Sequence, residues 1–129
     1  MTTLFLIGRL IFGLYWLNAA YNHLFKSAGM IGYTQSKGMS AGTAKLAVFG
    51  TGLLALIGGA SIILGYHPHY GMACIVIFLL GVTWKMHSYW NDTDPMQKMS
   101  NRVQFQKNIA LLGATLMMFA ITQPWAFSI

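Results

Sequence analysis

The chain has 129 residues, of which 56% are hydrophobic and 8% are charged, and its formal net charge is +6. A mean hydropathy of +0.56 lies far above that of soluble domains, so the composition excludes an ordinary soluble enzyme and indicates an integral membrane protein. The basic residues are dispersed at the ends of apolar runs, where lipid headgroups account for them, and they do not indicate a nucleic-acid partner.

Four apolar runs are long enough to cross a membrane, because a hydrocarbon core of about 30 Å requires roughly 20 helical residues. We predict helices at about residues 4–25, 44–65, 69–90 and 95–125. They nearly exhaust the chain, so we expect one transmembrane domain over residues 1–129 with an all-α, four-helix-bundle fold. Arg9 lies inside the first run and no basic region precedes it, which favours a retained helix over a cleaved signal peptide.

The connections between the predicted helices carry turn and capping signals. Residues 26–45 are rich in Gly, Ser and Thr and predict a surface segment lying on the membrane. Residues 65–71 predict a tight turn, with Pro68 suited to open the next helix. In the third connection, Asp94 as N-cap and Pro95 at the first helical position predict a helix that starts near residue 95 and continues through the polar residues into the membrane.

Most of the basic residues lie on one side of the predicted bundle. Seven lysines and arginines border or occupy the first and third connections: Lys26, Lys37, Lys45, Lys85, Lys98, Arg102 and Lys107. By the positive-inside rule, these connections should be cytoplasmic and both termini extracytoplasmic.

Polar side chains also gather at this basic edge. His23 ends the first helix, His87 and Trp90 end the third, and Lys107 and Asn108 lie where the fourth enters the bilayer. A polar group within a membrane helix costs free energy unless it finds a partner, so these residues are candidates for a ligand site. We expect the two histidines and Asn108 to form one polar site, because antiparallel neighbours bring such helix ends together. Interhelical hydrogen bonding without a ligand is the alternative.

Other chemistries receive less support from the residues. Cys74 is the only cysteine, so neither an intrachain disulfide nor a CxxC pair can form. No acidic residue lies inside a predicted span, which disfavours an ion-coupled transporter. His23 and His87 could serve as axial ligands of a haem, whereas the proline between His67 and His69 places that pair poorly for joint metal chelation. We therefore predict no metal site.

Four stretches resemble the DoxX family of small four-helix membrane proteins. His87 and Trp90, followed by FQKNIALLGA at 105–114, are similar to a family pattern in which F-x-K-N opens the fourth helix. GRLIFGLYW at 8–16, GLLALIGGASIILG at 52–65 and ITQPWAFSI at 121–129 resemble the first helix, the second helix and the ending. The chain departs from the many members that carry a glutamate in the second helix, because it has Ala55 there.

The resemblance implies a small membrane subunit associated with redox metabolism, in a prokaryotic inner membrane, because the family is named for a subunit of an archaeal thiosulfate:quinone oxidoreductase system. No flavin fingerprint, iron–sulfur cysteines or dithiol is present, so an accessory role beside a redox partner is expected. A quinone headgroup would need hydrogen-bond donors at interfacial depth and an apolar groove for its tail. The candidate ligand-binding residues are His23, His87, Trp90, Lys107, Asn108 and, from the first helix, Arg9.

Two further functions remain open on the sequence. One is a non-catalytic scaffold or assembly protein, in which the polar residues hold the helices together. The other is a b-type haem or metal-binding membrane protein. In each case membrane lipid and either a protein partner or a second copy of the chain are the expected partners.

Overall fold

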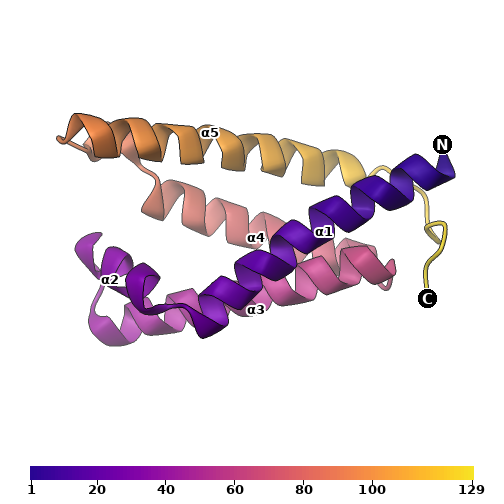
Figure 1. The fold of residues 1–129 in the computed structure, drawn as a ribbon, viewed down its shortest axis with the longest axis horizontal. Coiled ribbons are helices and arrows are strands. Elements are labelled where there is room, and N and C mark those ends of the chain that lie inside the picture. Colours follow the sequence, from indigo (N-terminus) through magenta and orange to yellow (C-terminus); the bar gives the residue numbers. More distant parts are fainter.

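The computed structural model describes residues 1–129, and the chain is mainly helical with no strands. The elements are α1 (Thr2–Phe25), α2 (Ala28–Ser36), α3 (Ala41–Leu64), α4 (Pro68–Met86), a 3-10 turn η1 (Tyr89–Asn91) and α5 (Pro95–Met118) (Figure 1). The predicted all-α class is confirmed. The predicted count of four helices is not confirmed, because the first connection contains the additional helix α2.

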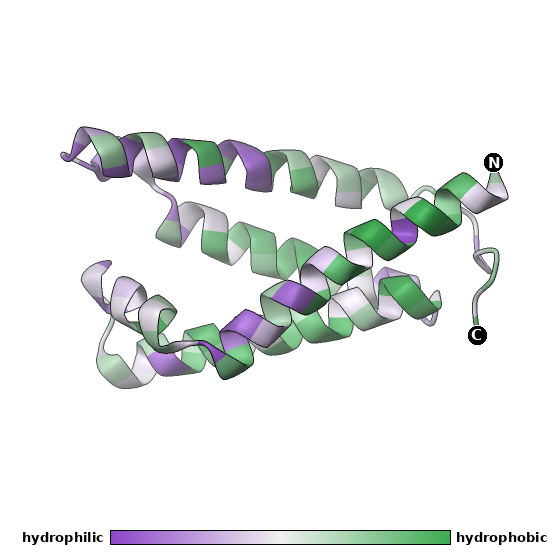
Figure 2. Ribbon diagram, viewed as in Figure 1, coloured by the Kyte–Doolittle hydropathy of each residue, from purple (hydrophilic) through white to green (hydrophobic).

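Three stretches are long and apolar enough to cross a membrane: α1, α3 and the segment Pro68–Asn91. Helix α5 has the length but not the composition, because its first half carries Lys98 and Arg102, and Lys107 follows directly after that half. Figure 2 shows hydrophilic residues concentrated along that half of α5, whereas α1, α3 and α4 are mainly hydrophobic. The sequence prediction of four apolar spans is therefore confirmed for three of them.

The buried face of α5 is itself polar. Its buried residues are Asn101, Asn108 and Thr115, at intervals of seven residues, a spacing that keeps side chains on one face of a helix. Helix α5 packs against α4, which packs against α3, which in turn packs against α1. The hydrophobic core between them is built around Trp16 and Leu79. Both chain termini lie at one end of the molecule, and α2 lies at the other (Figure 1).

Close contact between α1 and α3 depends on glycine. A Cβ atom added to Gly59 would lie 2.9 Å from the carbonyl oxygen of Gly13 and 3.0 Å from the backbone nitrogen of Leu17. Neither atom can move without moving a helix. Small residues are the expected contact residues of membrane helices, because apolar burial drives association only weakly in lipid and close packing replaces it.

Gly59→Ala is therefore expected to destabilise the protein by about 1–3 kcal/mol, the usual cost of overpacking. Thermal unfolding in detergent would measure this loss. Gly8→Ala is the matched control, because a Cβ there meets no atom within 4 Å and alanine favours a helix over glycine by up to about 1 kcal/mol. Equal melting temperatures for the two variants would show that the α1–α3 contact tolerates the extra methyl group.

The last predicted helix, 95–125, starts as expected but ends early. Asp94 Oδ2 accepts a hydrogen bond from the backbone nitrogen of Gln97 at 2.8 Å, which confirms the predicted N-cap. The helix stops at Met118, and residues 119–129 turn back across the end of the molecule, burying Trp125 to 3% exposure. Backbone outside a helix has free carbonyl oxygens, and the buried Arg9 binds two of them, at Ala126 and Phe127.

Candidate functional site

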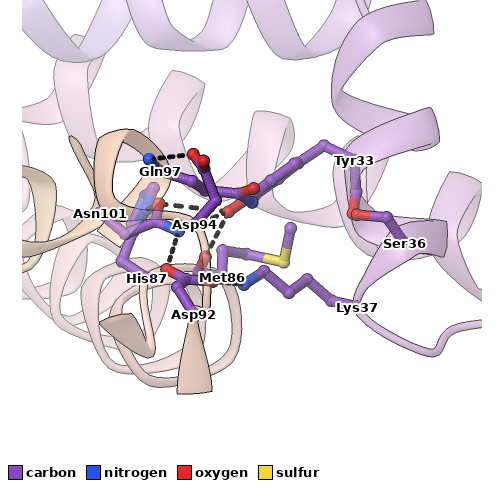
Figure 3. A network of polar contacts seen from close by, with 9 residues as sticks. All are labelled: Tyr33, Ser36, Lys37, Met86, His87, Asp92, Asp94, Gln97 and Asn101. Carbon is purple, nitrogen blue, oxygen red and sulfur yellow. Dashed lines mark hydrogen bonds and ion pairs between the residues drawn. The ribbon is translucent and has the colours of Figure 1, made fainter. Parts of the chain in front are cut away.

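A polar network ties α2, the end of α4 and the start of α5 together at the basic end of the molecule (Figure 3). At its centre is the buried side chain of Asn101. Its amide nitrogen donates to Asp92 Oδ2 at 2.7 Å and to the hydroxyl of Tyr33 at 2.9 Å. The Tyr33 hydroxyl lies 3.1 Å from the carbonyl oxygen of Met86, to which it can donate. Tyr33 thus connects α2 to both later helices.

Asp92 is the acidic member of this network. Besides accepting from Asn101, it forms an ion pair with Lys37, with 3.3 Å between Nζ and Oδ1. The hydrogen bond from Asn101 and, secondarily, the charge of Lys37 hold the pKa of Asp92 below its ordinary value. Asp92 is therefore a carboxylate at neutral pH, and a carboxylate can only accept hydrogen bonds.

The charge of Asp92 fixes the orientation of the Asn101 amide, and that orientation determines which ring nitrogen of neutral His87 carries the proton. Nδ1 of His87 lies 3.1 Å from Asn101 Oδ1. Turning the Asn101 amide over would place its oxygen against the Asp92 carboxylate, at the position now occupied by the donor nitrogen, so the orientation shown in Figure 3 is the satisfied one. Asn101 Oδ1 accepts, and Nδ1 of neutral His87 must therefore carry the proton.

His23, at the end of α1, also carries its proton on Nδ1, because of its contacts with α3. Its Nδ1 lies 3.2 Å from the carbonyl oxygen of Val48 and 2.9 Å from the hydroxyl oxygen of Thr51. A carbonyl oxygen cannot donate, so Nδ1 carries the proton. The hydroxyl of Thr51 has its own acceptor in the carbonyl of Ala47, at 2.8 Å. The His23 ring also packs against Phe78, with 5.4 Å between ring centroids.

The two histidines line one groove of about 730 Å³ between α1, α2, α3 and α4. We call it the histidine groove; its walls include His23, Met30, Val48, Thr51, Val82 and His87. The volume is within the usual range for small-molecule sites, and a mostly apolar wall with a few polar groups is their usual composition. The groove therefore has the size and chemistry to hold a lipophilic ring.

The structure does not bring the other candidates into this groove. Trp90 packs edge-on against Phe105, at 5.6 Å between centroids, and lines a separate, polar groove. Lys107 donates to Gln104 at 2.6 Å. Asn108 is buried on α5 but does not line the histidine groove, and Asn101 is the residue that bonds His87.

Arg9 lies at the opposite end of the molecule. It is 2% exposed, and its terminal nitrogens donate to the carbonyl oxygens of Ala126 at 2.8 Å, Phe127 at 2.9 Å and Ile63 at 3.1 Å. Ile63 lies in the last turn of α3, where carbonyl groups lack helical partners. Arg9 thus joins α1, the end of α3 and the C-terminal segment.

Sequence reasoning missed Asn101 and Tyr33. For Asn101 a signal was present, because Asn101, Asn108 and Thr115 repeat every seven residues along α5 and are all buried. For Tyr33 there was none, because its partners are 53 and 68 residues away in the chain.

A mainly apolar, all-α chain with three helices able to cross a membrane is an integral membrane protein. The model of the DoxX family matches residues 4–88, and the chain belongs to that family. The match runs from α1 to the end of α4, so the F-x-K-N sequence of α5 and the C-terminal ending lie outside it. No curated protein and no solved structure matched the chain significantly.

Proposed function

We propose that this DoxX family membrane protein binds a quinone or a similar lipophile in the histidine groove, as an accessory subunit that docks a redox partner in a prokaryotic inner membrane. The observation that carries the proposal is the groove itself. It combines a largely apolar wall with two imidazole rings held at fixed orientation. A ring with polar substituents and an apolar tail matches such a site.

The second part of the proposal, the redox partner, follows from what the chain lacks for electron transfer. Cys74 has no second cysteine to pair with, and a quinone needs a source or an acceptor of electrons. The redox partner would supply that source or acceptor of electrons. The basic end, where Lys85 lines the histidine groove and Lys37 lines the neighbouring polar groove, is the side on which we place the partner.

The proposal is tested by measuring retained and added lipophile. Protein purified in mild detergent should release a quinone or related lipid on solvent extraction, detected by mass spectrometry. His23→Leu and His87→Leu should each reduce retention at least about tenfold if one hydrogen bond of about 1.4 kcal/mol or more is lost. His69→Leu is the control, because His69 is exposed and stacks on Phe119 away from the groove.

A different result would favour the scaffold function. In that case the two histidine variants would melt at lower temperature than the wild type, but no lipophile would be found in any of the proteins, with or without added quinone.

We further propose that the basic end is cytoplasmic and that both termini are extracytoplasmic. The support is the position of seven of the eight basic residues, together with the two termini at the other end of the molecule (Figure 1). A reporter that is active only outside the cytoplasm, fused after Ile129, is expected to be active. The same fusion with a cytoplasmic reporter is the control, and activity of that second fusion would reverse the orientation.

A further inference from the structure

The histidine groove has few hydrogen-bond donors left to offer. The hydroxyl of Thr51 donates to the carbonyl of Ala47 at 2.8 Å, and that of Thr34 donates to the carbonyl of Met30 at 2.8 Å. The hydroxyl of Tyr33 has acceptors within the polar network. Each hydroxyl has one proton, so the three hydroxyl donors that line the groove are occupied within the protein.

The two histidines leave acceptors free. In both rings Nδ1 is the protonated nitrogen, because it faces a carbonyl oxygen in one case and an oriented amide oxygen in the other. Nε2 of the neutral ring is then an acceptor. Neither Nε2 makes a hydrogen bond within the chain, and neither is enclosed as a buried, unpartnered atom. Both are therefore available to a ligand.

The one remaining donor among the lining side chains is Lys85. This side chain is exposed and lines the polar groove as well as the histidine groove. A long lysine side chain at a membrane edge extends its ammonium group toward water and headgroups. Among the side chains that line the groove, the two Nε2 atoms are thus the free acceptors, and Lys85 is the free donor at its edge.

We propose that the ligand of the histidine groove is a hydrogen-bond donor, namely a lipophilic hydroquinone or a related phenol. This inference rests on the proposed function and specifies the redox state of the ligand. A hydroquinone donates its hydroxyl groups to the free Nε2 atoms. An oxidised quinone presents carbonyl oxygens, which only accept, so it would leave both Nε2 atoms unpaired.

This preference is the reverse of what the sequence suggested. The family resemblance implied a quinone, toward whose carbonyl groups the histidines would act as donors. The bonds from His23 to α3 and from His87 to Asn101 use the one proton of each neutral ring, and so turn both residues into acceptors. In a site built to bond a hydroxyl group, the analogue without it binds more weakly because buried polar groups stay unpaired.

The test uses three compounds with the same ring: tetramethylhydroquinone, tetramethylbenzoquinone and the dimethyl ether of the hydroquinone. Dissociation constants are measured by calorimetry under argon, on wild-type protein in detergent at about pH 8, where an imidazole of ordinary pKa is neutral. We expect the hydroquinone to bind at least about tenfold more tightly than the other two, the effect of one or more lost hydrogen bonds. The dimethyl ether keeps the aromatic ring of the hydroquinone but has no hydroxyl donor. It therefore separates the effect of losing the donors from the effect of changing the ring.

The possible outcomes distinguish this inference from the proposed function. Binding of all three compounds with equal affinity, or tighter binding of the quinone, would overturn the inference and leave a lipophile site in place. Binding of none would refute both. Abolition of the preference in His87→Phe, with His69→Phe unchanged, would support the inference.

A second measurement needs no ligand and leaves both groove histidines unchanged. Nitrogen NMR of protein labelled with ¹⁵N-histidine distinguishes protonated from unprotonated ring nitrogens, with signals assigned by loss in His67→Gln and His69→Gln. We expect the two remaining rings to carry the proton on Nδ1. A proton on Nε2 in both rings would make them donors and overturn the inference even if the histidine variants failed to fold.

Discussion

Replacing Arg9 with methionine is expected to destabilise the protein by about 3–5 kcal/mol, an effect as large as breaking a buried polar cluster elsewhere. The side chain is 2% exposed and donates to the carbonyl oxygens of Ile63, Ala126 and Phe127. Hydrogen bonds to a charged group contribute about 1.5–3 kcal/mol each. Methionine fills similar space but leaves three carbonyl groups without their donor.

The rings of Phe5 and Trp125 add to the effect, because the Arg9 guanidinium lies 5.9 Å from the centroid of each. Thermal unfolding in detergent would give the loss in stability, and limited proteolysis would show release of residues 119–129. Arg102→Met is the matched control, because Arg102 is exposed on α5. If the two variants unfolded at the same temperature, the contacts of Arg9 would not be what holds the C-terminal segment.

Asn101→Leu is expected to destabilise the basic end and to release α2. The change keeps the volume of the side chain but removes the partner of His87, Tyr33 and Asp92. Each buried polar group left without a partner costs about 1–3 kcal/mol. The pKa of Asp92 should also rise toward its ordinary value, because the bond from Asn101 is the largest cause of its lowering.

Hydrogen–deuterium exchange would locate the effect. Residues 28–36 should exchange faster in Asn101→Leu than in the wild type, because Tyr33 anchors α2 through this network. Gln106→Leu, at an exposed position of the same helix, should leave their exchange unchanged. Unaltered exchange of α2 in both variants would mean that packing against α3 alone holds it.

The parts of the fold that sequence predicted correctly depend on local signals. Asp94 and Pro95 start α5 where expected, since a cap bonds only to the next few residues. Pro68 opens α4 for the same reason, and Gly65 ends α3 with a φ of 69°, a conformation that glycine adopts without strain. The apolar composition of three spans is likewise a local property.

The parts that sequence missed depend on contacts between distant residues. Helix α2 contains two glycines, which disfavour a helix, and it is held by the long-range bonds of Tyr33. The C-terminal segment turns back to Arg9, 117 and 118 residues away. For the candidate site, the sequence placed both histidines at one end of the bundle, and they line one groove. Their role as acceptors depends on Val48 and Asn101, which no sequence signal linked to them.

The polar buried face of α5 has a consequence for how the protein is made. Because α1, α3 and Pro68–Asn91 are the spans with apolar composition, a nascent chain that has inserted only these would cross the membrane an odd number of times. Helix α5 buries Asn101, Asn108 and Thr115, and its first half is charged, so lipid alone is a poor environment for it. Helix α4 must therefore be in place to receive it. The last step of biogenesis would be docking onto a protein surface, and the side of the membrane reached by the C-terminus would depend on that docking.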